Sequence, residues 1–251
     1  GASKELDDKF FYYYLSVLQS EILRKAGGAA QPNISTKAIS EFDIPLPPLG
    51  QQKKIAAILD TADAYRQKTK ALIAKYDELT QSLFLDMFGD PVTNPKGWET
   101  KELQHVTTKI GSGATPTGGK EAYKSEGISL IRSLNIYDNR FQYKNLAFID
   151  DDQASKLKNV IVEQDDVLFN ITGASVCRST VVPIDVLPAR VNQHVSIIRA
   201  EKSILHSLFI SHLLISESVK RVLLGVGAGG GAVMEAITKK QLQEYKIITP
   251  P

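Results

Sequence analysis

Four polar segments carry the side chains that could recognise another molecule, namely residues 110–120, 132–144, 170–180 and 190–194. Arginine can donate two hydrogen bonds to guanine, and asparagine or glutamine can pair in the same way with adenine. Tyrosine and hydroxyl side chains commonly bind phosphate oxygens. The sequence therefore predicts a nucleic-acid interface that contains Ser112, Thr115, Thr117, Lys120, Arg132, Asn135, Tyr137, Asn139, Arg140, Asn170, Thr172, Arg178, Gln193 and His194.

These segments also have purely structural interpretations. The segment 132–144 interleaves basic and aromatic residues most densely, yet it also fits an ordinary solvated hairpin loop. Asn170 and Thr172 are typical turn residues, whose side chains bond the backbone at the end of a strand. This structural role does not prevent either residue from also contacting a nucleic acid. A single histidine such as His194 is more often part of a core or a turn than of a binding site.

Motifs for catalysis or cofactor binding are not apparent, whether nucleophile elbow, zinc motif, dinucleotide fingerprint or methyltransferase motif. The glycine-rich run 225–231 lacks the Lys-Ser/Thr that completes a phosphate loop, and it follows a helix, so we interpret it as a flexible helix exit. Consecutive carboxylates on a turn do not converge, so we interpret residues 150–152 and 165–166 as solvated turns. We therefore expect no enzymatic activity, no metal and no cofactor in this chain.

The composition is that of an ordinary globular protein, with 251 residues, 43% hydrophobic and a net charge of +2. This mildly basic balance does not by itself imply a nucleic-acid partner. The single cysteine, Cys177, excludes an internal disulfide and fits a reducing compartment. No apolar run reaches the roughly 18 residues of a membrane span. With no signal peptide visible, we expect a soluble, cytoplasmic protein that does not bind membranes.

A long helix is predicted between Gly50 and Gly89, because these 38 intervening residues contain neither proline nor glycine. Apolar residues recur at alternating spacings of four and three, which is the pattern of a coiled-coil seam. We expect a spacer and pairing rod; the alternative is a surface helix packed on its own domain. The predicted seam contains Ile58, Ala62, Tyr65, Leu72, Tyr76, Leu79 and Leu83, with the polar Thr69 in its middle.

A β-rich domain is predicted after the rod. Short apolar or alternating runs at 128–134, 159–162, 166–171 and 195–199 are bounded by turn residues, as strands are. The run 208–224 predicts a helix. We expect an α+β fold, in which a curved or barrel-like sheet packs against one or two helices.

An internal repeat frames the rod. Residues 34–48 (ISTKAISEFDIPLPP) and 237–251 (ITKKQLQEYKIITPP) are identical at six positions, and an apolar helical stretch precedes each copy. A shared order of helix, glycine-rich joint, turn and Pro-Pro exit indicates duplication of a domain. We expect the chain to be a piece of a two-copy protein, with one copy nearly whole and the other reduced to its tail.

The chain resembles the specificity subunit of type I restriction–modification systems. The segments that carry this resemblance are 44–55, 88–91 with 94–98, 166–175 and 192–195. Glycine is common in the family where this chain has Cys177, and the family's recognition loops vary freely. The resemblance implies three parts: residues 1–48 as the tail of a first target recognition domain, residues 49–90 as the central conserved helix, and residues 91–251 as a second target recognition domain.

The resemblance also implies a non-catalytic subunit that reads one half of a split site on double-stranded DNA. It would recruit methyltransferase subunits and, through them, restriction subunits. S-adenosylmethionine, ATP and Mg²⁺ are then expected on those partners. Because one of the family's two paired helices is missing here, we expect the rod to pair antiparallel with a second copy of the chain.

Two other functions remain open from the residues. A coiled-coil adaptor with a protein-binding β domain would need an exposed apolar patch at its loops, where this sequence has Arg, Asn, Gln and Tyr. A fused enzyme related to DNA methyltransferases would need cofactor and catalytic motifs, which are not apparent.

Overall fold

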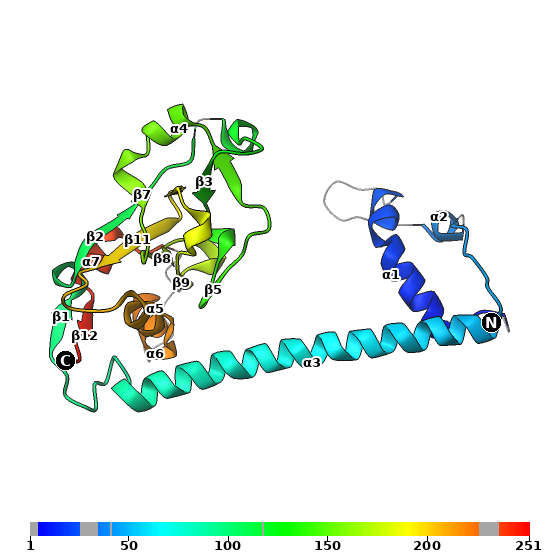
Figure 1. Cartoon of the computed structure of the whole chain (residues 1–251), viewed down its shortest axis with the longest axis horizontal. Helices are drawn as coiled ribbons and strands as arrows, with labels where there is room; N and C mark the ends of the chain where they lie inside the picture. The colour runs from blue at the N-terminus through cyan, green and yellow to red at the C-terminus, as the bar shows by residue number, and fades with distance from the viewer. Residues whose placement is uncertain (1–4, 26–34, 41, 117, 226–235) are drawn as a thin grey trace. The chain divides into compact units, whose positions relative to one another are not determined.

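The computed structural model describes residues 5–25, 35–40, 42–116, 118–225 and 236–251. The chain divides into two compact units, Gly1–Tyr76 and Asp77–Pro251. The boundary between them falls inside the long helix of Figure 1.

The first unit contains helices α1 (Asp8–Lys25), α2 (Thr36–Ser40) and most of α3 (Leu49–Phe88). Asp7 caps α1, because its carboxylate accepts from the backbone N–H groups of Lys9 and Phe10. Gln52 is fully buried, and its amide accepts from Asp7 N–H at 2.8 Å while donating to two carbonyls, those of Glu5 and Pro47. This one side chain therefore ties three chain segments together at the start of α3.

The helix α3 is 40 residues long, which confirms the predicted helix. It ends where Gly89 adopts a φ of +78°, and Gly89 N–H donates to Leu85 O at 2.8 Å. The last carbonyls of the helix find partners in the following turn. Lys96 Nζ donates to Asp86 O and Met87 O, and Trp98 Nε1 donates to Phe88 O at 2.7 Å. These bonds explain the structural role of segments 88–91 and 94–98, which carry the family resemblance.

The predicted seam of α3 faces solvent in this chain. Its large apolar members, which expose between 50 and 69% of their surface, are Ile58, Tyr65, Leu72, Tyr76, Leu79 and Leu83. Ala62 and Thr69 are exposed as well, and the hydroxyl of Thr69 bonds Tyr65 O at 3.0 Å. The seam thus presents exposed apolar side chains along the helix, and its pairing with another helix stays a prediction.

The second unit is an α+β domain, as predicted. Its strands are β1 (Thr100–Glu102), β2 (Thr107–Ser112), β3 (Ile128–Ile131), β4 (Ile136–Tyr137), β5 (Arg140–Phe141), β6 (Ala147–Ile149), β7 (Ile161–Val162), β8 (Val167–Asn170), β9 (Ser179–Val181), β10 (Ala189–Val191), β11 (Val195–Ala200) and β12 (Lys246–Ile248). They form two four-stranded sheets, ordered β6-β3-β10-β7 and β2-β11-β8-β9, and two pairs, β1-β12 and β4-β5. Its other helices are α4 (Asp151–Ser155), α5 (Ser207–Ile215), α6 (Glu217–Leu223) and α7 (Lys239–Glu244).

The sheet β2-β11-β8-β9 is buried on both faces. Phe169 and Ile198 point into one core, which they share with Ile210 of α5, whereas Leu168 and Ile197 point into a second core. Burial on both faces explains why β8 and β11 are nearly continuous apolar runs. Figure 1 shows α5 beside β8 and β9, in agreement with the contacts between these elements.

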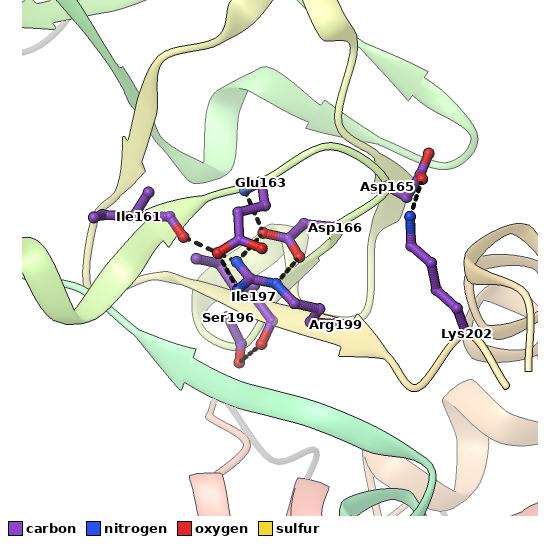
Figure 2. Close-up of polar contacts among 8 residues, drawn as sticks. All are labelled: Ile161, Glu163, Asp165, Asp166, Ser196, Ile197, Arg199 and Lys202. Carbon is purple, nitrogen blue, oxygen red and sulfur yellow. Dashed lines mark hydrogen bonds and ion pairs between the residues drawn. The ribbon is translucent and has the colours of Figure 1, made fainter. Parts of the chain in front are cut away.

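Two expectations about this unit need correction. The predicted helix 208–224 is two helices, because Ser216 adopts an extended conformation between them. The prediction of a solvated turn at residues 165–166 is wrong for one of the two carboxylates. Asp166 is fully buried, and both of its carboxylate oxygens accept from the guanidinium of Arg199, at 2.7 and 2.8 Å (Figure 2). Asp165 is partly exposed and pairs with Lys202 at 2.8 Å.

The internal repeat is visible in local structure. Helices α2 and α7 begin at matched positions, Thr36 and Lys239. The residue that precedes α7, Thr238, caps it by accepting from Gln241 N–H. The apolar face differs between copies, because Leu242 is fully buried whereas its counterpart Ile39 is 46% exposed. Most of the glycine-rich joint before α7 lies outside the described residues.

Candidate nucleic-acid interface

A groove of about 640 Å³ opens in the second unit, between the β4–β5 hairpin, the segment that connects β8 to β9, and the turn that connects β10 to β11. Four predicted interface residues line it: Tyr137, Thr172, Arg178 and His194. Its lining residues, all within the described part of the chain, include no carboxylate. Segments far apart in the sequence thus build one groove that suits an anionic ligand.

The β4–β5 hairpin is held firmly at one side of this groove. Tyr137 and Arg140 are cross-strand partners, and Asn139 has a φ of +52° in the tight turn between them. Asn139 N–H donates to Ser179 O at 2.9 Å, and Ser179 N–H donates to Asp138 Oδ1 at 3.3 Å. Asp138 also forms an ion pair with Lys220 of α6. The hairpin tip is therefore fixed to β9 and α6.

Two arginines share the ring of Tyr137. The guanidinium carbon of Arg178 lies 4.5 Å from the ring centroid, and that of Arg140 lies 5.1 Å from it. The backbone of Arg178 is fixed, because its carbonyl accepts from Asn170 N–H at 2.9 Å. These are cation–π distances.

A chain of hydrogen bonds joins four predicted residues, two of which line the groove. The hydroxyl of Thr115 donates to Gln193 Oε1, and Gln193 Nε2 lies 3.0 Å from His194 Nε2. His194 Nδ1 lies 2.6 Å from Thr172 Oγ1. These contacts hold the His194 ring between Gln193 and Thr172.

Two predicted contacts are wrong, because Asn135 and Asn170 are fully buried. Asn135 uses both ends of its amide inside the fold, accepting from Arg132 N–H at 3.1 Å and donating to Gln142 O at 2.8 Å. Asn170 donates to Ser133 O and Ser175 Oγ, both at 3.0 Å, and these two serines line the groove. Buried amides with such partners hold loops in place and cannot touch DNA.

Other predicted residues lie away from the groove lining. Arg132 donates to Asn145 O at 2.5 Å and stacks on Tyr123, 5.0 Å from its centroid. The amide of Asn139 lies 3.3 Å from His212 Nδ1, and burial lowers the pKa of His212, which favours the neutral acceptor. Ser112 ends β2 opposite Ser196. Thr117 lies outside the described residues, as does the side chain of Lys120.

Sequence reasoning missed the groups that position the groove. Lys220 is far from Asp138 in the chain, and nothing in the sequence pairs them. Cys177 is fully buried with a φ of +68°, a conformation that favours glycine. Its departure from the family's usual glycine was the signal that this turn is special. Burial raises the pKa of the Cys177 thiol to about 12, so the thiol is not a nucleophile at neutral pH.

Two further findings concern the part of the chain that the structure describes. Within it, the His, Cys, Asp and Glu side chains form no group of three or more that could hold a metal ion. Its helices include none that is both long and apolar enough to cross a bilayer.

The family model for the type I restriction modification DNA specificity domain matches residues 2–78 and 95–251, which is most of the chain. The chain belongs to this family. The specificity-domain match comprises two segments that flank the end of α3. The family residues at 166–175 lie in the structure at β8 and the groove, and those at 192–195 lie in the turn that carries His194.

Curated relatives agree with this membership. The chain is 24% identical over 236 residues to the type I restriction enzyme MjaVIII specificity subunit of Methanocaldococcus jannaschii, covering 88% of this chain and 55% of the relative. It is 25% identical over 242 residues to the EcoBI specificity subunit of Escherichia coli, covering 86% of this chain and 50% of the relative. The specificity-domain chain thus spans about half the length of the curated relatives it matches.

A solved structure shares the fold. The crystal structure of the type I restriction-modification system S subunit from M. genitalium has a TM-score of 0.53 and 17% identity, covering 97% of this chain and 61% of that one. At this identity the likeness supports the fold of the specificity-domain chain and nothing further.

Proposed function

We propose that this chain is the DNA sequence-recognition subunit of a type I restriction–modification enzyme and that its second unit reads one half-site of a bipartite target. The observation that carries this proposal is the groove, which gathers Tyr137, Thr172, Arg178 and His194 and has no carboxylate among the described residues that line it. Membership of a DNA specificity family supports it.

The remaining parts of the proposal concern partners. The chain recruits methyltransferase subunits and, through them, restriction subunits, and it acts in the cytoplasm without catalysing a reaction itself. S-adenosylmethionine, ATP and Mg²⁺ belong to those partners. The helix α3 acts as spacer and as pairing surface, since its apolar seam is exposed at 50–69% in the large side chains from Ile58 to Leu83.

A salt-dependent binding titration tests the recognition step. The whole chain is titrated against a pool of random duplexes at several salt concentrations, and the retained duplexes are sequenced. Binding should weaken with salt by a slope of about 0.9 in log–log units for each phosphate that the protein neutralises. Enrichment of a motif of a few base pairs would support a reader of one half-site.

Absence of binding even at low salt would reject the proposal. A control variant outside the groove makes the test specific to the groove. Lys202, which pairs with Asp165 away from the groove, serves as the matched position, because Lys202→Ala removes one positive charge from the protein as Arg178→Ala does. Only Arg178→Ala should change which sequences are retained.

A further inference from the structure

The two arginines on the ring of Tyr137 differ from the other arginines of the second unit. Among the described residues, the side chains of Arg140 and Arg178 have no hydrogen bond or ion pair, and each guanidinium lies by the ring of Tyr137, at 5.1 and 4.5 Å from its centroid. By contrast, Arg199 is bound by Asp166 and Arg221 by Glu217. Two cations thus lie within cation–π distance of one ring, and their side-chain N–H groups donate to no other described residue.

The surroundings keep these donors free. Asp138 lies between Tyr137 and Arg140 in the hairpin and would be the natural partner of either arginine. It is occupied instead by the ion pair with Lys220 and by the N–H of Ser179. Stacking engages the flat face of a guanidinium and leaves its N–H edge pointing outward. Both edges are therefore available to a ligand that offers paired acceptor atoms.

Two parts of a DNA duplex offer such paired acceptors, namely the N7 and O6 atoms of guanine and the oxygens of a phosphate. A phosphate contact needs only a nearby positive charge, which a mobile lysine or arginine supplies. A stacked arginine has a fixed direction, and a fixed planar fork matches the guanine edge. Positioning by the ring of Tyr137 therefore favours contact with a base, because contact with a phosphate does not require it.

We propose that Tyr137 is a positioning residue that holds Arg178 and Arg140 so that they donate to the N7 and O6 atoms of guanine. The half-site read by this groove then contains at least one G·C pair at an invariant position. Arg178, which lines the groove, makes the main contact, and Arg140 reads the same or an adjacent guanine from the hairpin. This inference rests on the proposed function and narrows it to a base type and three residues.

Selection from a random duplex pool gives the first test. The wild-type chain should enrich guanine at one or more positions of its motif. Arg178→Lys keeps the charge but loses the two-pronged donor, so preference for guanine at one position should fall by roughly 5- to 150-fold. Retention of random duplex should change by no more than about twofold, since the phosphate attraction depends on charge.

Base analogues locate the contact on the DNA. Replacing the enriched guanine by 7-deazaguanine removes N7 and should weaken the wild-type complex, while the Arg178→Lys complex should lose little more. A neutral methylphosphonate at the same nucleotide removes the phosphate charge instead, and it should weaken the two proteins equally. This pair of analogues separates base reading from backbone binding.

Variants of the ring test its positioning role. Tyr137→Phe keeps the ring and should keep the guanine preference, whereas Tyr137→Leu should lower that preference by roughly 2- to 5-fold for each arginine it releases. Thermal unfolding of both variants should match the wild type. An unchanged preference in Tyr137→Leu would show that the ring does not position the arginines.

The outcomes distinguish this inference from the function on which it rests. DNA retention without guanine in the motif, or equal weakening of selected and random duplex by Arg178→Lys, would overturn the guanine assignment and leave DNA binding standing. Failure of the wild type to retain any duplex at low salt would overturn both.

Discussion

At the scale of single residues, burial decides which polar side chains hold the fold and which can meet a ligand. Asp166 is fully buried and bound on both oxygens by Arg199, and Gln52 is fully buried and bound to three backbone groups. Arg178 and Arg140 carry the same guanidinium group as Arg199, but among the described residues their side chains contact only the ring of Tyr137. The residues in the first group are therefore structural, and those in the second are candidates for recognition.

Replacing Arg199 by alanine should destabilise the protein strongly. Asp166 would then be a buried carboxylate without its counter-ion, which costs about 3–5 kcal/mol in the free energy of unfolding. Figure 2 shows this carboxylate facing the guanidinium, whereas the nearby Asp165–Lys202 pair is separate from it. Urea unfolding followed by circular dichroism measures the effect.

The neighbouring pair provides the control for that variant. Lys202→Ala breaks an ion pair whose lysine side chain is 73% exposed, so stability should hardly change. Equal losses of stability in the two variants would contradict the view that burial of Asp166 is what makes Arg199 important.

At the scale of elements, close backbone approach fixes the loops around the groove. The end of β2 passes so near β10 that a Cβ atom on Gly113 would lie 1.8 Å from Val191 O. Gly113 N–H also donates to Asn192 O at 3.1 Å, one residue before Gln193. This approach places the Thr115 hydroxyl against Gln193, which in turn bonds His194.

A Gly113→Ala variant should therefore lower the free energy of unfolding by more than about 1 kcal/mol, because the strands must separate to admit the methyl group. Gly111, two residues earlier in β2, has nothing within 4 Å of the position that a Cβ would take. Gly111→Ala should leave stability unchanged or raise it by up to about 1 kcal/mol. A thermal melt of the two variants compares them directly, and equal melting temperatures would reject the steric argument.

At the scale of the whole molecule, the seam of α3 is exposed in a single chain. Its large apolar residues from Ile58 to Leu83 expose at least half of their surface. A stripe of this kind, with heptad spacing, is typical of a helix that pairs with another helix. We infer antiparallel pairing with a second copy, in which the two-fold axis crosses the middle of the seam.

Sedimentation equilibrium at tens of micromolar should accordingly give the mass of a dimer. Leu72→Glu places a charge in the seam and should shift the equilibrium toward the monomer. Lys70→Glu introduces the same side chain off the predicted seam, and it should leave the dimer intact. A wild-type chain that is strictly monomeric under these conditions would refute the pairing.

The sequence by itself determined the features that depend on local chemistry and period. The stretch between Gly50 and Gly89, which contains neither proline nor glycine, specifies α3. The apolar runs at 166–171 and 195–199 specify β8 and β11. The repeat at 34–48 and 237–251 specified the matched starts of α2 and α7. Family membership followed from short segments in a fixed order. All of these signals lie within neighbouring residues of the chain.

Only the tertiary structure decided which polar residues meet at one site. Asn135 and Arg140 are five positions apart in a single polar segment, yet Asn135 is buried and Arg140 lies on the ring of Tyr137. The pairing of Asp138 with Lys220 and of Thr115 with Gln193 joins residues whose distance along the chain hides their contact. Side-chain type sets what a residue can do, but burial and long-range packing set whether it is free to do it.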